Sequence, residues 1–276
     1  GSYHQQLIAC TNHASLQGES QNRLQLGGIA GACSDSTLED CANTGKIASL
    51  SGGDVGGLIG SSTDGTFTGG VNSGDVSVSS AQNSEIFMGG IVGVNSGTNI
   101  LQCANTGNIT GENIFDTTDE EASHSTFLYA GGIVGRSFES SPVSDSYNTG
   151  DICASSAFTT VHIGGITGIC YYRDEISRCW NSGSLTGYAP LYSYAGGIVG
   201  YSGYVTNCYN TGDFSLSGSQ RGTHLGGIAA RTGNSVSNSY NTGSLSYENA
   251  ANLYHGPIVG RQEDGTVTNC YYLDTS

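Results

Sequence analysis

An aromatic or imidazole side chain recurs two residues before a repeated Gly-Gly pair, and a row of such side chains could bind a ligand. Because strand residues alternate between two faces, this position points away from its aliphatic neighbours, and we expect it on the outer surface. Surface rings can stack on sugars or pack against a protein, although stacked aromatics also stabilise a sheet without any ligand. The position is held by Gln25, Asp54, Phe87, Tyr129, His162, Tyr194, His224 and Tyr254. The candidate ligand-binding residues are therefore Phe87, Tyr129, His162, Tyr194, His224 and Tyr254.

A second aromatic position directly precedes a repeated Asn-Thr-Gly or Asn-Ser-Gly turn. It is held by Tyr147, Trp180, Tyr209, Tyr240 and Tyr271. Because this position adjoins a turn, the sequence leaves open which face it occupies. The Asn that follows is expected inside the fold, where stacked amides would bond one another and the turn backbone. This Asn column comprises Asn12, Asn43, Asn72, Asn105, Asn148, Asn181, Asn210 and Asn241.

The segment 112–125 lengthens one repeat and is rich in carboxylates. Its acidic residues include Asp116, Asp119, Glu120 and Glu121. Clustered carboxylates can hold Ca²⁺, so a structural Ca²⁺ is the one cofactor to consider for this segment. The spacing matches no calcium-loop template, so we expect an extended, solvated acidic loop with no bound metal.

Six of the nine cysteines share one position of the repeat: Cys10, Cys41, Cys103, Cys179, Cys208 and Cys270. Gly or Ser takes that position in the other repeats, which indicates a tight interior site filled by free thiols. The odd total and the absence of a C-x-x-C motif argue against a disulfide framework and a zinc site. Neighbouring coils could bring Cys179 and Cys208 within disulfide reach, but parallel side chains fit the required torsion poorly.

The sequence contains no obvious set of catalytic residues. A glycosidase needs two carboxylates across a cleft, yet the column of Asp75, Asp151 and Asp213 is interrupted by uncharged residues and a lysine. No G-x-S-x-G, G-x-G-x-x-G or H-E-x-x-H motif occurs. We therefore expect a protein that is not an enzyme, with a carbohydrate-active enzyme on a β-helix as an alternative.

The elements that carry these residues belong to a repeat of about 30 residues. A Gly-Gly-aliphatic motif occurs eight times, from LGGIAG at Leu26 to HGPIVG at His255, and the Asn-Thr-Gly motif follows each copy after about 14 residues. Each unit holds three short apolar segments, which cannot close a core alone but can pair with the copies above and below. The sequence therefore predicts an all-β fold, a single-stranded parallel β-solenoid (β-helix) of eight to nine coils, with right-handed winding as the commoner choice. It would form one domain over 1–276, with a partial first coil over 1–23.

Composition excludes several classes of protein. Gly accounts for 44 of 276 residues and Pro for only 3, without the three-residue period of collagen. The formal net charge is −15 with 8 Lys and Arg, and no basic cluster exists to displace counterions from nucleic acid. No run of 18 apolar residues appears, so we expect no membrane insertion.

The paired motifs resemble the GLUG repeat of bacterial surface proteins. VTNCYNTGDF, from Val205 to Phe214, is close to the family pattern, and the resemblance covers nearly the whole chain. The resemblance implies a secreted or cell-surface location in a bacterium and a role in cell adhesion. Such repeats also occur in non-catalytic parts of immunoglobulin A1 proteases, but the zinc-binding motif of that activity is absent here.

These observations lead to one functional expectation and two alternatives. We expect a non-catalytic extracellular binding module, a monomeric fragment of a longer surface protein, that presents a stiff rod to a host glycan or glycoprotein. The first alternative is a purely structural stalk or spacer. The second is the carbohydrate-active enzyme considered above.

Overall fold

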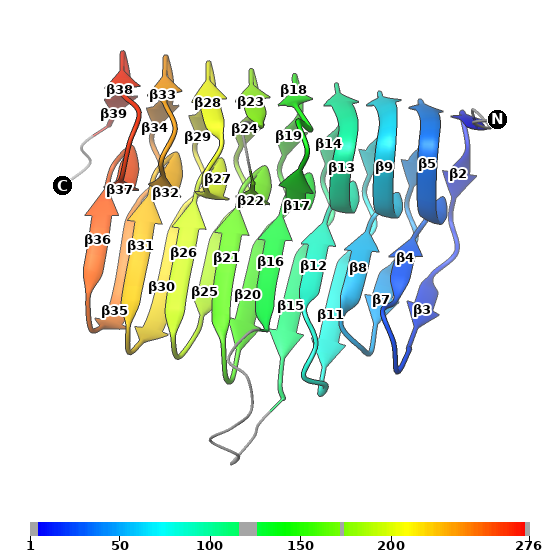
Figure 1. Ribbon diagram of the computed structural model, residues 1–276, viewed down its shortest axis with the longest axis horizontal. Helices are drawn as coiled ribbons and strands as arrows, with labels where there is room; N and C mark the ends of the chain where they lie inside the picture. The colour runs from blue at the N-terminus through cyan, green and yellow to red at the C-terminus, as the bar shows by residue number, and fades with distance from the viewer. Residues whose placement is uncertain (1–4, 116–125, 172–173, 274–276) are drawn as a thin grey trace.

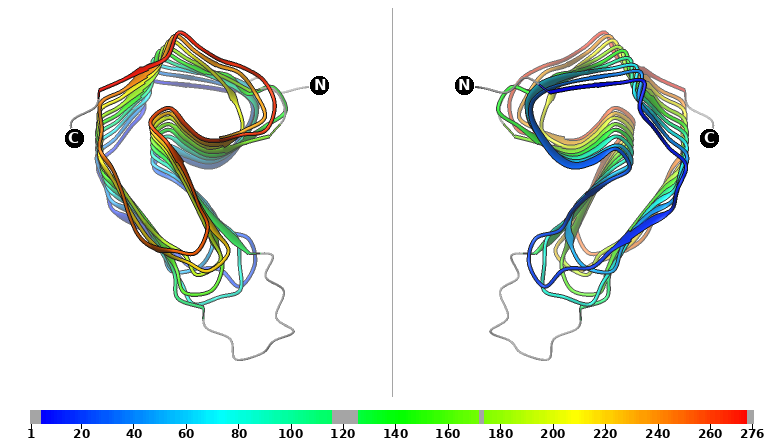
Figure 2. Two further views of the ribbon diagram at one scale, coloured as in Figure 1. Left: turned by 90° about the vertical axis from the view of Figure 1, so that its left-hand side faces the viewer. Right: turned by 90° about the vertical axis from the view of Figure 1, so that its right-hand side faces the viewer.

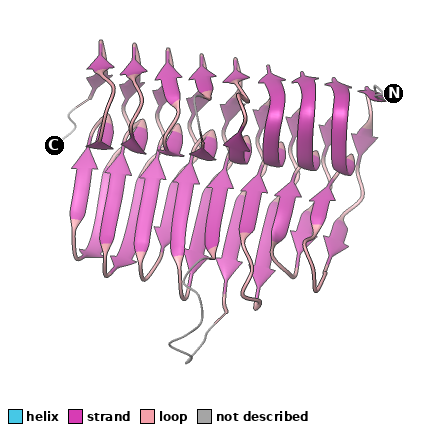
Figure 3. Cartoon of the chain, viewed as in Figure 1, coloured by secondary structure: helices cyan, strands magenta, loops and turns pink. Residues whose placement is uncertain are grey.

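The computed structural model describes residues 5–115, 126–171 and 174–273. Within these ranges the chain forms only strands, turns and loops, and it winds into stacked coils of four parallel sheets (Figures 1 and 3). We name the sheets A to D in the order in which the chain visits them in each coil. The predicted all-β parallel solenoid is confirmed. The described part of the chain has no helix able to span a bilayer.

Sheet A follows the sharpest bend of the coil. One long strand rounds this bend in the early coils, as in β13, and two shorter strands replace it from β17 onward. The strands of sheet A are β1 (Gln5–Ile8), β5 (Ala30–Glu39), β9 (Ile59–Thr68), β13 (Val92–Leu101), β17 (Val134–Phe138), β18 (Val143–Ser144), β22 (Thr167–Cys170), β23 (Glu175–Ser177), β27 (Val199–Tyr201), β28 (Tyr204–Thr206), β32 (Ala229–Thr232), β33 (Val236–Ser237), β37 (Val259–Gln262) and β38 (Val267–Thr268).

Sheet B contains nine strands of only two residues, which carry the Asn column and its neighbour. They are β2 (Thr11–Asn12), β6 (Ala42–Asn43), β10 (Val71–Asn72), β14 (Ala104–Asn105), β19 (Tyr147–Asn148), β24 (Trp180–Asn181), β29 (Tyr209–Asn210), β34 (Tyr240–Asn241) and β39 (Tyr271–Tyr272).

Sheets C and D each contain eight strands and face one another across the coil. Sheet C consists of β3 (Leu16–Gly18), β7 (Ile47–Ser49), β11 (Val76–Ser80), β15 (Ile109–Asn113), β20 (Ile152–Ser156), β25 (Leu185–Tyr188), β30 (Phe214–Ser219) and β35 (Leu245–Ala250). Sheet D consists of β4 (Gln25–Gly27), β8 (Gly53–Gly56), β12 (Ile86–Gly89), β16 (Phe127–Gly131), β21 (Thr160–Gly164), β26 (Tyr192–Gly196), β31 (Gly222–Gly226) and β36 (Leu253–Gly256).

The views along the rod show the path of each coil. In the left-hand view of Figure 2, which looks from the C-terminal end, the chain passes over the top, down the outer wall and up the inner limb toward the viewer. This is a right-handed winding. Eight strands in sheet D and nine in sheet B agree with the eight to nine predicted coils, and β1 to β3 lie within the predicted partial first coil.

The Gly-Gly corner and the Asn column meet inside the coil and divide its interior. A Cβ added to Gly132 would lie 2.1 Å from the Gly165 carbonyl oxygen and 2.5 Å from Cγ of Asn148, so only glycine fits there. One apolar core fills the space between sheets A and B, and a second fills the space between sheets C and D. The Gly-Gly motif and the Asn-Thr-Gly motif therefore lie on opposite walls of the coil at the place where these walls touch, which is why the motifs recur together. We call this place the waist of the coil.

The Asn column is a continuous hydrogen-bonded ladder. Each Nδ2 donates to Oδ1 of the Asn in the next coil, at 2.7–2.8 Å from Asn12 through to Asn241. The same amide also donates to a carbonyl two residues later in its own turn, as from Asn148 to Gly150 at 2.7 Å. Apart from the terminal Asn12, these side chains are buried. The ladder gives their amide groups hydrogen-bond partners, without which burial would destabilise the fold. The predicted asparagine ladder is confirmed.

The residue before the cysteine position adopts a left-handed backbone in every coil. Its φ angle lies between 48° and 66° at Ala9, Asp40, Gly69, Gln102, Asp145, Arg178, Asn207, Asn238 and Asn269. This corner turns sheet A into sheet B. The cysteines that follow are free thiols, and burial raises the pKa of Cys103 to about 12. The expectation of interior free thiols is confirmed for Cys41, Cys103, Cys179 and Cys208, whereas Cys10 and Cys270 at the two ends are half-buried.

Replacing one amide of the ladder should lower stability sharply. In Asn148→Ala, the Asn105 amide and the Gly150 carbonyl each lose a partner inside the core, so we expect the free energy of unfolding to fall by about 3 kcal/mol. Denaturant unfolding monitored by circular dichroism measures this change. The control is Thr149→Ala at the exposed neighbouring position, which should stay within about 0.5 kcal/mol of the parent. Equal losses in the two variants would contradict the role given to the ladder.

Candidate binding surfaces

The six candidate residues do form one stacked column on sheet D. Their strands pair in register, and the rings lie nearly parallel, with centroids 5.3 Å apart for Phe87 and Tyr129 and 4.3 Å apart for His162 and Tyr194. The stack continues through His224 to Tyr254 at 4.6 and 4.7 Å. The column faces away from the core between sheets C and D, as the alternation predicts.

The expectation that this column is exposed is wrong. The exposed fraction is 7% or less for five of the six residues, and only Tyr254, in the last coil, is open at 42%. The coil bends inward after sheet D (Figure 2), and the outer face of sheet A folds back over the column. We call this filled bend the notch. These five rings expose little surface, although Phe87 still lines the pocket described below, and Tyr254 is the one widely exposed candidate.

Arginine and tyrosine side chains from sheet A cover the column in the notch. The facing position of successive coils holds Val94, Arg136, Ile169, Tyr201, Arg231 and Arg261. The Arg136 guanidinium lies 5.2 Å from the Phe87 ring centroid, and that of Arg261 lies 5.0 Å from the Tyr254 centroid. Such cation–π contacts stabilise a guanidinium against an apolar wall. The column therefore packs between sheets D and A, which fits the structural role that stacked aromatic residues can also have.

The two histidines of the notch are held neutral. Burial lowers the pKa of His162 to about 3 and that of His224 to about 4, and the positive charge of Arg231 acts in the same direction on both. The Nδ1 atoms of both rings are buried and have no hydrogen-bond partner among the described residues. These imidazoles act as flat, uncharged members of an aromatic stack.

The second aromatic column points outward and is the accessible one. Tyr147, Trp180, Tyr209, Tyr240 and Tyr271 lie on the outer face of sheet B, in register and stacked within 4° of parallel for the measured pairs. The first three are half-buried, and Tyr240 and Tyr271 are 42% and 71% exposed. We call these five residues the aromatic ladder. Alternation could have predicted their facing, because the Asn that follows each of the first four points inward.

Uncharged polar groups flank most of the aromatic ladder. One side carries exposed Asn207, Asn238 and Asn269, of which the last two are joined by a 3.2 Å amide hydrogen bond. The other side carries the exposed hydroxyl-bearing residues Thr149, Ser182, Thr211 and Thr242. Near the start of the ladder, Asp145 and Arg178 form an ion pair at 2.6 Å that lowers the pKa of the Asp145 carboxyl. The surface thus combines apolar rings with amides and hydroxyls.

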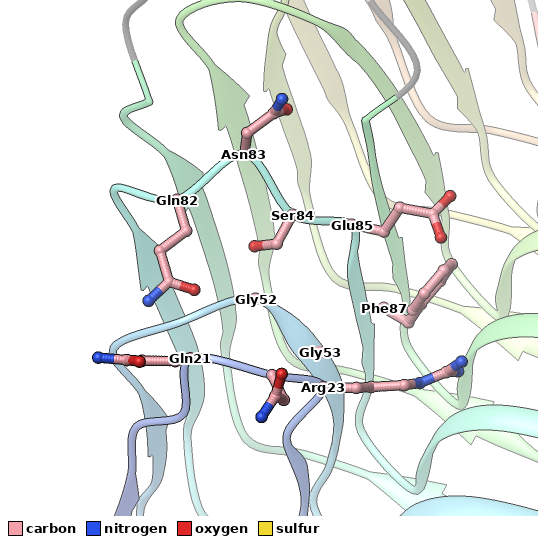
Figure 4. A pocket seen from close by; sticks show the side chains of 10 residues that line it. Gln21, Arg23, Gly52, Gly53, Gln82, Asn83, Ser84, Glu85 and Phe87 are labelled. Atoms are coloured by element: carbon pink, nitrogen blue, oxygen red, sulfur yellow. The ribbon is translucent and has the colours of Figure 1, made fainter. Parts of the chain in front are cut away.

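A polar pocket of about 620 Å³ opens near the N-terminal end of the notch (Figure 4). Gly52 lies between Arg23 on one coil and Glu85 on another, and Phe87 closes one side. The Arg23 guanidinium makes a bidentate ion pair, with distances of 2.9 Å, to the fully buried Asp54 carboxylate. Burial raises the pKa of Asp54, and Arg23 offsets part of this effect. Of the residues that line this pocket, sequence reasoning singled out only Phe87, because the others belong neither to a repeated motif nor to an aromatic column.

The remaining acidic residues in the described part of the chain do not converge on a site. Asp75, Asp151 and Asp213 are exposed and accept hydrogen bonds from backbone amides of the adjacent coil. Asp174 is buried and holds Ser137 and Ser141. The calcium candidates Asp116, Asp119, Glu120 and Glu121 lie outside the described residues. Within the described ranges, no group of three or more His, Cys, Asp or Glu side chains is placed to hold a metal ion.

Comparison with known proteins gives no relative. No family model, no curated protein and no solved structure matches the chain.

Stability should fall as the pH drops below 6.5 because of the two buried histidines. Their pKa values are lower in the folded protein than the ordinary value of 6.5, so the unfolded chain binds more protons and folding is weakened on acidification. Between pH 6.5 and pH 5 the loss is about 2 kcal/mol for each histidine. Denaturant unfolding at both pH values measures it, with the double variant His162→Phe, His224→Phe as reference. If the parent and the double variant lose the same stability, the histidines do not carry this pH dependence.

Proposed function

We propose that this protein is a non-catalytic binding module that holds a glycan chain along the aromatic ladder. In this proposal it belongs to an exported bacterial surface protein and contacts a host glycan or glycoprotein. The resemblance to the GLUG repeat supports the location, and the single observation that carries the binding role is the outward-facing, partly exposed aromatic ladder.

The chemistry of the aromatic ladder suits an uncharged polyhydroxyl ligand. Sugars present C–H faces that pack on aromatic surface and hydroxyls that both donate and accept hydrogen bonds. Tyr and Trp combine apolar area with a polar group, and the flanking amides and hydroxyls supply further donors and acceptors. The net charge of −15 disfavours an acidic polymer, so a neutral glycan is the better match.

The frame beneath the aromatic ladder favours binding without rearrangement. Each ring precedes an interior ladder position, and for Tyr147, Trp180, Tyr209 and Tyr240 that position is a buried, hydrogen-bonded Asn. Side chains fixed in this way lose little conformational entropy on contact with a ligand. A repeated surface also meets a repeated ligand at several points, which raises avidity.

Removing central rings of the ladder should abolish most glycan binding. We expect Trp180→Ala and Tyr209→Ala each to weaken binding to the best glycan on an array by about tenfold, as for a central aromatic contact at an interface. A titration with that glycan then measures the dissociation constant. The matched control is Tyr188→Ala, which removes a tyrosine that is 44% exposed on sheet C.

The outcomes separate this proposal from its alternatives. Failure of the parent protein to bind any glycan or glycoprotein would overturn the binding role and favour a structural stalk. Glycan cleavage by the parent would favour the carbohydrate-active enzyme. Glycan binding that is unchanged in both ladder variants would show that the site lies on another surface. Circular dichroism of each variant shows that loss of binding does not result from unfolding.

A further inference from the structure

Gly52 lines the pocket between two coils whose corresponding positions carry the charged residues Arg23 and Glu85. Arg23, Gly52 and Glu85 each lie two residues before the notch column, on the same outer face as Gln25, Asp54 and Phe87. In later coils this position holds Phe127, Thr160, Tyr192, Gly222 and Asn252, and the rings of Phe127 and Tyr192 lie 5.7 and 6.1 Å from the next ring of their own strands. A Cβ at Gly52 would lie 2.1 Å from Oγ of Ser84 and 2.6 Å from the Glu85 carbonyl oxygen, so glycine allows the two coils to approach closely beside the pocket.

The facing wall of the notch is also small at this end. The positions on sheet A that cover the rings elsewhere with Arg136 or Tyr201 are held by Ala32 and Ser61 in the first coils. The backbone at the floor of the pocket is fixed, because the Gly53 amide donates to the Glu85 carbonyl oxygen at 2.9 Å. The pocket is therefore part of the stacked frame, and its volume of about 620 Å³ lies within the usual range for small-ligand sites.

The charges around the pocket balance. Arg23 is neutralised by Asp54, and the positive charges of Arg136 and Arg23 act on Glu85, an exposed residue whose pKa is nevertheless raised by partial desolvation beside the pocket wall. Two of the Arg23 nitrogens, Nε and Nη2, bond Asp54, and Nη1 is not among these donors. Four carboxamides, those of Gln21, Asn22, Gln82 and Asn83, add donors and acceptors around the opening. A site of this composition favours a ligand that is neutral and rich in hydroxyls.

We propose that this pocket binds a single neutral sugar residue, with Glu85 accepting hydrogen bonds from two ring hydroxyls, the carboxamides bonding the others, and Phe87 closing the apolar side. The inference rests on the proposed function for its ligand class, but it uses a surface apart from the aromatic ladder. The rod would then hold a glycan at two places, with the chain on sheet B and one sugar residue in the pocket.

Saturation-transfer NMR with free sugars tests this site on the whole protein. The probes are N-acetylglucosamine, N-acetylgalactosamine and the methyl glycosides of glucose, galactose and mannose. We expect saturable binding of at least one probe, with an affinity lowered about tenfold in Glu85→Gln, which replaces a charged acceptor oxygen with a donating amide, and about fivefold in Gln82→Ala, which removes a carboxamide. Glu248→Gln, an exposed acid on β35, is the matched control and should bind like the parent.

The outcomes also distinguish this site from the aromatic ladder. If none of the five probes shows saturable binding, the proposed sugar site in the pocket is overturned. Binding that is unchanged in both pocket variants overturns it as well. Binding that is kept in Glu85→Gln but lost in Trp180→Ala assigns the sugar to the ladder and likewise overturns the pocket. Loss in Glu85→Gln with no effect of Trp180→Ala supports it, even if the array shows no ladder-dependent binding.

Discussion

The contact between the Gly-Gly corner and the Asn ladder is the constraint on which the rest of this structure depends. At the waist of the first seven coils the backbone of one wall touches the amides of the other, so no side chain larger than hydrogen fits at the second glycine, whereas Pro257 takes this position in the last coil. Because every amide also bonds the coil above it, a coil shifted by one residue would lose its ladder partner. The register of all four sheets follows, and with it the position of every column on the surface.

Much of the fold could be predicted because this constraint is visible in the sequence. The two motifs recur with the same period. The Gly-Gly pair indicates a close approach of two chain segments, and the repeated Asn indicates a polar column in the interior. The left-handed corner before the cysteine position is less visible, although Asp, Asn or Gly, which tolerate this backbone, hold six of its nine positions. Ala9, Gln102 and Arg178 at the other three weaken the pattern, because stacking holds their backbone in a conformation that their residue types do not favour.

The candidate site was harder to predict because alternation gives the direction of a side chain but not what lies opposite. Tyr129 and His162 point out of the coil, as expected, yet the bend of sheet A returns to cover them. The facing residues Arg136 and Ile169 follow Tyr129 and His162 by only seven residues in sequence, but nothing in the repeat shows that the chain doubles back there. The accessible rings are instead those of sheet B. Their orientation follows from the ladder asparagines beside them.

Hydrogen exchange of the ladder side chains tests the central claim most directly. The Nδ2 protons of Asn72, Asn105, Asn148 and Asn181 are predicted to exchange as slowly as the backbone amides of the same coils, since both are released only when coils separate. The exposed amide of Asn207 gives the rate for an unprotected side chain in the same protein. If the four ladder amides exchange as fast as Asn207, the ladder does not hold the coils in register and the account is contradicted.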